Sequence, residues 1–198
     1  KVGELLFVQP NHAEAAFEIM DGLIKTGEVG LVVLDSVAAM ATRSEIEGEI
    51  GDANMGVKAR LMGQALRIIS ISAHQFNTAL LFINQERSSL GLTYGNHRVT
   101  PGGDALKYQA SLRIRLSLGL KIGKENVFTG QFVKATITKN KIGPPFGSEM
   151  FTVEFGSGVS LEHELLKIGL MAGLWTQKGA WFSINGKAVA NGTDAMVA

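Results

Sequence analysis

The chain has 198 residues, 45% of them apolar and 19% charged, which is enough to bury one core and a small appendage. Its 19 basic and 18 acidic side chains give a net charge of +1, which neither favours nor excludes a polyanionic partner. The lack of cysteine excludes disulfides and thiolate metal sites, and no apolar run reaches the length of a membrane span. We therefore expect a cytoplasmic globular protein with no membrane partner. The chain begins without methionine and enters an apolar run almost at once, so we also expect a fragment.

The first 35 residues read as strand, helix and strand. Apolar runs at 5–8 and 31–35 predict buried strands, and the second ends in a carboxylate, Asp35. Residues 12–25 carry apolar side chains at helical spacing, and Gly27 just beyond them is a suitable C-cap. Continuous apolar runs are typical of strands covered on both faces, and this element order implies a parallel sheet.

An acidic stretch at 43–54 predicts a surface loop, and the longest helical signal follows it at 55–74. The spacing of its apolar residues predicts an inward face made of Val57, Leu61, Ala65, Ile68, Ile69 and Ser72. Arg60, Gln64 and Arg67 are predicted to share another face of this helix, directly after the loop.

A further apolar run at 80–84 predicts a strand that leads into a long polar loop, and a short helix begins at 104–107. Beyond it, three segments alternate apolar and polar residues, which predicts antiparallel strands that extend the parallel sheet. These segments are 111–118, 132–139 and 150–155. A helix at 162–171 and a Trp-containing tail follow. We predict an α/β fold with a mostly parallel central sheet, a core at 1–158 and a small α+β C-terminal subdomain at 159–198.

Polar side chains follow two of the predicted parallel strands. A carboxylate such as Asp35, followed by Ser36, lies at the edge where α/β proteins bind ligands, and it can hold the Mg²⁺ of a nucleotide. A capping role for this aspartate is an equal alternative. Gln85 ends the next strand, where an amide can hydrogen-bond a γ-phosphate or an attacking water. The alternative is that the Gln85 side chain only forms hydrogen bonds with nearby backbone groups.

Two loops carry groups that suit single-stranded nucleic acid. The candidate residues in and beside them are Met55, Gly56, Arg60, Arg67, Arg87, Tyr94, Arg98, Gly102 and Gly103. The arginines supply cations along a phosphate backbone, the tyrosine a stacking platform, and the glycines exposed amides at a helix start. Ordinary solvated arginines are the alternative for any single residue. Two such loops at one sheet edge favour the nucleic-acid interpretation.

Lys139 and Lys141 lie two residues apart at a predicted strand end, so their side chains point the same way. They could converge on one phosphate, or form a solvated strand edge. No G-x-x-x-x-G-K-[ST] phosphate-binding motif occurs in the 198 residues.

Six segments together carry a more specific pattern. In chain order they are LVVLDSVAAM, SEIEGEIGDANMG, LLFINQ, PGGDALKY, KNKIGPPF and GAWFS. This order resembles the bacterial and phage RecA recombinases over essentially the whole chain. The resemblance implies a RecA-like ATPase core, incomplete at its N-terminal side, and a function in homologous recombination and DNA repair. It also implies ATP and Mg²⁺ as cofactors, single- and double-stranded DNA as partners, and assembly into a homo-oligomeric helical filament.

The resemblance assigns roles to individual residues. Asp35 matches the Walker B carboxylate and Gln85 the γ-phosphate sensor, whereas Lys139 and Lys141 match a pair that reaches the neighbouring subunit's ATP. The two DNA-binding loops would be 45–55 and 86–103. Further matches are Arg67, Gly102 and Gly103 on the DNA backbone, Met55 between bases, and Lys107-Tyr108 at the filament interface.

The departures from the family pattern concern both the ATP site and the DNA-binding loop. The family's P-loop and catalytic glutamate would precede Lys1, so we predict no ATPase activity for this chain alone. Glu86, Ser88 and Ser89 change the charge or apolar character of the second loop, and Asp104 replaces an asparagine beside the two glycines. Asp104 either weakens DNA affinity or caps its helix. The alternative functions are a non-catalytic DNA-binding or filament-interaction module and, as a third, a related hexameric helicase.

Overall fold

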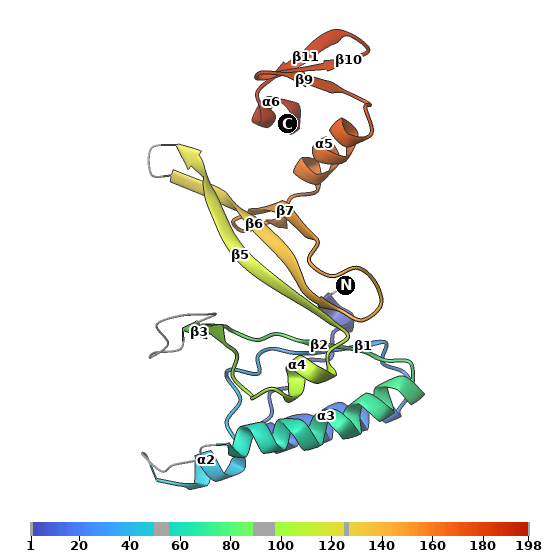
Figure 1. Ribbon diagram of the computed structural model, residues 1–198, viewed down its shortest axis with the longest axis vertical. Coiled ribbons are helices and arrows are strands. Elements are labelled where there is room, and N and C mark those ends of the chain that lie inside the picture. Colours follow the sequence, from blue (N-terminus) through green and yellow to red (C-terminus); the bar gives the residue numbers. More distant parts are fainter. Residues whose placement is uncertain (1, 50–55, 89–97, 125–126, 198) are drawn as a thin grey trace. The chain divides into compact units, whose positions relative to one another are not determined.

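The computed structural model describes residues 2–49, 56–88, 98–124 and 127–197 (Figure 1). The chain divides into two compact units, unit 1 at Lys1–Ala110 and unit 2 at Ser111–Ala198.

Unit 1 is an α/β unit built on a two-stranded parallel sheet. Its elements are η1 (Val2–Glu4), α1 (Ala13–Lys25), β1 (Leu31–Leu34), α2 (Arg43–Glu47), α3 (Val57–Gln75), β2 (Ala79–Phe82), β3 (Arg87–Ser88), β4 (Arg98–Val99) and α4 (Ala105–Gln109). The parallel pairing of β1 with β2 confirms the predicted sheet type, with Leu31 opposite Ala79 and Leu34 opposite Phe82.

The core of unit 1 lies between α1, α3 and one face of this sheet. Its buried members are Phe17, Met20, Ile24, Val32, Val37, Met62, Ala65, Leu66, Ile69 and Ala73. The other face is open within unit 1, since Leu31, Val33 and Leu81 are 55%, 48% and 50% exposed. The expectation of strands covered on both faces is therefore not met inside this unit.

The predicted buried strand at Leu5–Val8 is wrong. These four residues form no strand and are 48–75% exposed. An apolar segment becomes a strand only when a neighbouring strand supplies its ladder of hydrogen bonds, and no described strand pairs with this one.

The buried face of α3 overlaps the predicted stripe only in part. Ala65, Ile69 and Ser72 are buried as expected, but Ile68 is 49% exposed. Met62 and Leu66, which the predicted stripe did not include, are buried, because the helix turns the i, i+4, i+7 series from Met62 toward the sheet.

Unit 2 is an antiparallel assembly followed by a small α+β end. Its elements are β5 (Leu112–Lys124), β6 (Val127–Asn140), β7 (Ser148–Glu154), β8 (Gly158–Val159), α5 (Leu161–Met171), β9 (Thr176–Lys178), β10 (Trp181–Ile184), β11 (Lys187–Asn191) and α6 (Thr193–Val197). The first four strands form one antiparallel sheet in chain order, and β9 to β11 form a second one. The predicted α/β class and the antiparallel strands are confirmed, although the parallel and antiparallel sheets have no strand in common.

Polar contacts hold α5 against β7. Lys167 pairs with Glu149 and donates to the Met150 carbonyl at 3.1 Å, and the His163 Nδ1 atom lies 3.5 Å from Glu154 Oε1. Phe182 of β10, only 1% exposed, is the largest fully buried side chain of this unit.

Candidate nucleotide and DNA interface

The carboxyl ends of β1 and β2 bring the first two candidate residues to one edge. The Ile83 amide donates to the Leu34 carbonyl at 3.0 Å, and the Val37 amide donates to the Ile83 carbonyl at 2.9 Å. Asp35 therefore follows β1 at the same edge at which Gln85 follows β2. Both residues are exposed, and Ser36 is half-buried. We call Asp35, Ser36, Asn84 and Gln85 the carboxyl edge.

The carboxyl edge offers a single carboxylate for a cation. Among the residues that the structure describes, no group of three or more His, Cys, Asp or Glu side chains could hold a metal ion by itself. One exposed carboxylate suits Mg²⁺ that is bound mainly by phosphates and water. Asp35 thus fits a nucleotide-bound Mg²⁺ and does not make a site for an isolated metal ion.

The second candidate loop closes at a narrow base, formed by residues 84–88 and 98–103, which we call the neck. Arg87 pairs with Val99 across β3 and β4, and the Asn84 side chain donates to the Pro101 carbonyl at 3.0 Å. Arg98 belongs to β4. Tyr94, Ser89 and, at the first loop, Met55 lie outside the described residues.

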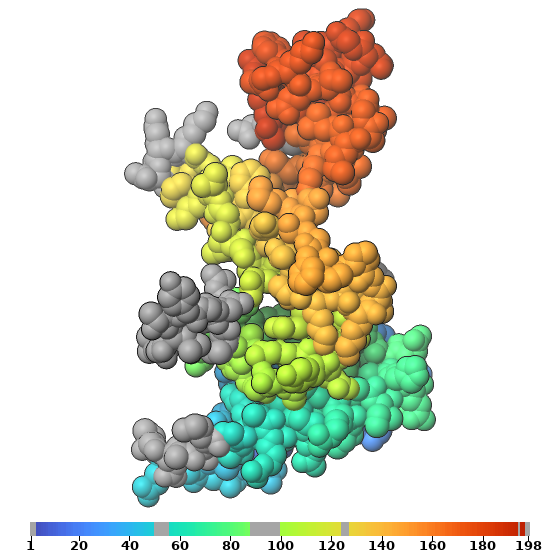
Figure 2. Space-filling view, viewed as in Figure 1, coloured from blue at the N-terminus to red at the C-terminus, as the bar shows by residue number. Residues whose placement is uncertain are grey.

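Gly102 and Gly103 are required by backbone geometry and by close packing. Their φ angles are +90° and +74°, a region that L side chains rarely adopt. A Cβ atom at Gly102 would lie 3.0 Å from Val37 Cγ1, and one at Gly103 would lie 2.8 Å from Ala59 Cβ of α3. Gly102 is buried, against the expected exposed amide, because it packs on Val37 and Met62. Figure 2 shows the yellow-green part of the chain that follows the second loop next to the teal helix α3, in agreement with these contacts.

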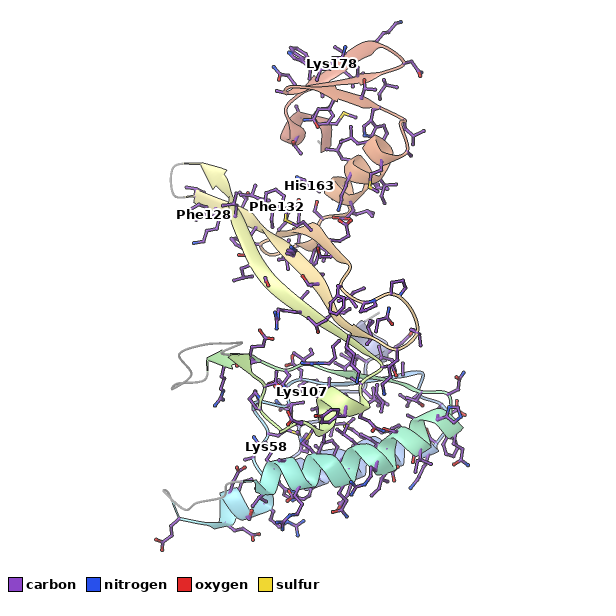
Figure 3. All side chains as sticks on the ribbon, in the orientation of Figure 1. Lys58, Lys107, Phe128, Phe132, His163 and Lys178 are labelled. Carbon is purple, nitrogen blue, oxygen red and sulfur yellow. The ribbon has the colours of Figure 1, made fainter. Side chains whose placement is uncertain are left out.

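Of the two alternatives for Asp104, the structure does not support the helix cap. Asp104 occupies the N-cap position of α4 but has helical backbone angles, φ −88° and ψ −12°, and makes no capping hydrogen bond. Capping side chains need an extended backbone at this position. The carboxylate instead pairs with Lys107 Nζ at 2.6 Å. Figure 3 shows Lys107 on α4, which packs on the α3 helix that carries Lys58.

The predicted polar face of α3 is present. Arg60, Gln64 and Arg67 are all exposed along the helix, whose first residue follows Gly56. Gly56 has a φ of +85°, so it also makes a turn that favours glycine.

A short helix, α2, stands where the sequence predicted only loop. Thr42 and Glu45 form a reciprocal capping box at its start, and the Arg43 amide donates to Glu14 Oε2 at 3.0 Å. Burial raises the pKa of the Glu14 carboxyl, but hydrogen bonds from backbone amides and from His12 outweigh burial and lower it overall. The T-x-x-E pattern could have revealed this helix from the sequence.

In unit 2, a third cation joins the lysine pair. Lys139 lies in β6 opposite Arg113 of β5, and the Lys141 amide donates to the Ser111 carbonyl at 2.9 Å. Burial, followed by the positive charges of Lys141 and Arg113, lowers the pKa of Lys139. Sequence reasoning missed Arg113, whose position follows from the hairpin register.

The comparisons with known proteins bear on this arrangement. The family model of the RecA N-terminal domain matches residues 1–160. The chain belongs to the RecA family. It is 43% identical over 189 residues to Protein RecA of Desulforapulum autotrophicum, covering 96% of this chain and 54% of that protein. It is 42% identical to Protein RecA of Thioalkalivibrio sulfidiphilus, covering 98% and 56%. The chain thus spans about half the length of these relatives.

A solved structure shows the same fold. The crystal structure of the RadB recombinase superposes with a TM-score of 0.51 at 20% identity, covering 77% of this chain and 61% of that one. No helix in the described part of the chain is both long and apolar enough to cross a membrane. The predicted boundary at residue 158 stays a prediction, as do the site residues.

Proposed function

We propose that this chain is part of a RecA-family protein that acts in homologous recombination and DNA repair, in the cytoplasm. The whole protein binds ATP with Mg²⁺, forms a helical filament on single-stranded DNA, and pairs that strand with a homologous duplex. The observation that carries the proposal is the shared carboxyl edge, which brings Asp35 beside the neck of the predicted DNA loop, to which Gln85 belongs.

In this proposal the carboxyl edge binds the Mg²⁺ and the terminal phosphate of the nucleotide. Bound ATP·Mg²⁺ supplies the phosphoryl group whose hydrolysis allows turnover. Asp35, beside Ser36, would hold the metal through its carboxylate, and the Gln85 amide would hydrogen-bond the terminal phosphate. Gln85 follows β2 and is itself part of the neck, so a change at its backbone reaches the loop.

The DNA strand would run along two positive elements. Arg60 and Arg67 are exposed on α3, and Arg87 and Arg98 belong to the short strands of the neck. Cations along a DNA backbone give a sequence-independent affinity that falls with salt. Met55 and Tyr94 are proposed to contact bases, and Gly102 and Gly103 to let the backbone approach.

The cations of unit 2 would face a phosphate of a neighbouring copy. Arg113, Lys139 and Lys141 are like charges held close together, and the lowered pKa of Lys139 reflects their repulsion in addition to burial. A bound anion relieves such repulsion. Tyr108 of α4, 75% exposed, is proposed to contribute to the filament contact together with Lys107.

One alternative has an observation in its favour. The chain contains no G-x-x-x-x-G-K-[ST], so a non-catalytic module for DNA binding or filament interaction is the second candidate. ATP hydrolysis by the 198 residues alone would contradict this alternative.

The test measures binding of a labelled single-stranded oligonucleotide by the natural gene product that contains these residues. We expect tighter binding with a non-hydrolysable ATP analogue than with ADP, and loss of the difference in Gln85→Ala. Gln75→Ala, at the exposed end of α3, is the matched control and keeps the difference. Equal binding in both nucleotide states would favour the non-catalytic DNA-binding module, and no binding would overturn both DNA-binding functions.

A further inference from the structure

The side chain of Asn84 joins two segments of the neck that are 17 residues apart. Its Nδ2 atom donates to the Pro101 carbonyl at 3.0 Å, and its Oδ1 atom accepts from the Gln85 amide at 2.9 Å. The side chain is half-buried, so water competes only in part for these bonds. One amide group thus holds both the exit from β2 and the return of the loop.

The primary amide of Asn84 serves both contacts because it carries a donor and an acceptor on separate atoms. The Pro101 carbonyl is an acceptor and needs a donor, whereas the Gln85 amide is a donor and needs an acceptor. A carboxylate could accept from Gln85 but would face the Pro101 oxygen with a second acceptor. An aliphatic side chain of the same size could do neither.

The Asn84 bonds complete a closed ring of contacts at the carboxyl edge. From Ile83 the ring runs to Val37 through a 2.9 Å backbone hydrogen bond, and from Val37 to Gly102 by direct packing. Gly102 follows Pro101, which returns to Asn84. The turn after Asp35, the end of β2 and the loop return therefore cannot shift independently.

We propose that Asn84 is the positioning residue that transmits a backbone displacement at Gln85 to the Pro101–Gly103 segment. This inference rests on the proposed function and deepens it, because it names the residue through which nucleotide binding at Gln85 would change the DNA-binding segment Pro101–Gly103. Asn84 itself touches neither ligand in this scheme. Its effect is on the ratio of DNA affinities between two nucleotide states.

The test uses three substitutions in the same natural gene product. Asn84→Asp keeps the shape and the acceptor but removes the donor to Pro101, and Asn84→Leu removes both bonds without adding charge. Thr78→Val is the matched control. Thr78 Oγ1 donates to the Val29 carbonyl at 2.8 Å at the opposite end of β2, so it loses one side chain to backbone bond of the same kind.

Two measurements separate a positioning role from a merely structural one. Amide hydrogen exchange follows the segments 83–88 and 99–104, and single-stranded DNA affinity is compared with ADP and with the ATP analogue. We expect Asn84→Asp to raise exchange in both segments by about fivefold, as loss of one hydrogen bond implies, and Asn84→Leu, which loses two, by at least as much. We also expect the ratio of DNA affinities with the ATP analogue and with ADP, about fivefold or more in the unsubstituted protein, to fall toward one in both variants. Thr78→Val should change neither quantity.

Each other outcome is decisive. Unchanged exchange at 99–104 in both Asn84 variants overturns the inference. If exchange rises but DNA affinity falls equally in both nucleotide states, the positioning role is overturned, since the ratio of the two affinities would be unchanged. Absence of any nucleotide effect in the unsubstituted protein is the failure of the proposed function, recognisable because it requires no substitution.

Discussion

Units 1 and 2 both place candidate functional groups on a sheet, but by opposite means. In unit 1, Asp35 and Gln85 stand beyond the ends of two short parallel strands, and a few bonds around Asn84 fix them. In unit 2, Arg113 and Lys139 face each other along strands of 13 and 14 residues, where the ladder register sets their positions. The first arrangement should therefore respond to single changes at one edge, whereas the second should respond to loss of the packing that supports a whole sheet.

The largest expected effect tests whether the units are energetically separate. Phe182→Ala removes a side chain that is 1% exposed, and we expect it to destabilise unit 2 by about 3–5 kcal/mol. Trp181→Ala is the neighbouring control, since that side chain is 53% exposed. Urea unfolding followed by hydrogen exchange measures each unit separately. Equal destabilisation of unit 1 would contradict the separation.

The next effect concerns the neck of unit 1. Gly103→Ala adds a strained backbone and a Cβ atom 2.8 Å from Ala59 Cβ, so we expect a loss of about 2–4 kcal/mol in unit 1. Gly56→Ala is the matched control, because its φ of +85° is similar but nothing lies within 4 Å of the added atom. It should cost about 1 kcal/mol, measured by the same unfolding experiment. Similar costs for both would show that packing on α3 is unimportant.

The same contrast explains what could be predicted from the sequence. The shared edge of Asp35 and Gln85 was predictable, because successive strand–helix–strand units place strand ends together. The strand predicted at Leu5–Val8 was wrong, because a strand also needs a neighbouring strand to pair with, and the segment's own sequence does not show whether one is present. The contacts of Asn84 with Pro101 and of Gly102 with Val37 were beyond reach, since they join residues distant in sequence. Helix α2 was within reach through Thr42 and Glu45.

A smaller effect links α1 to α3 and depends on pH. Ser72 Oγ donates to Asp21 Oδ1 at 2.6 Å, and hydrogen bonds from Lys25 and then Ser72 lower the pKa of the Asp21 carboxyl despite burial. Because the folded-state pKa is below the unfolded one, the stabilisation is present above the unfolded pKa and is lost as pH falls through the folded pKa. Ser72→Ala should cost about 1–2 kcal/mol at neutral pH and less in acid.

The control for this pH dependence is Ser70→Ala. Ser70 Oγ donates to the Leu66 carbonyl, an acceptor that does not titrate, so its cost should not change with pH. Denaturant titrations between neutral pH and about pH 3, which brackets the titration of aspartate, provide the comparison. A Ser72→Ala cost that stayed constant over this range would contradict the role given to the Asp21 charge.

The smallest effect concerns charge at the start of α4, directly after the neck of unit 1. Asp104 pairs with Lys107 at 2.6 Å, but the carboxylate is 64% exposed, so the pair itself contributes little to stability. Asp104→Asn removes one negative charge beside the proposed DNA path and releases the ammonium group from it. We expect single-stranded DNA affinity to rise by about two- to fivefold, with a steeper salt dependence of binding. Glu28→Gln makes the same charge change before β1, at the opposite end of the sheet, and should leave affinity unchanged.

A double-mutant cycle with Lys107→Met separates the two causes of that gain. If Asp104 acts by holding Lys107, the gain from Asp104→Asn disappears when the lysine is absent, because no cation remains to be released. If the carboxylate acts by direct repulsion of phosphate, the gain persists in the Lys107→Met background. Lower affinity in Asp104→Asn would contradict both, and would mean that the pair orients Lys107 toward the strand. The cycle thus decides whether Asp104 lowers DNA affinity by holding Lys107 or by repelling the phosphates directly.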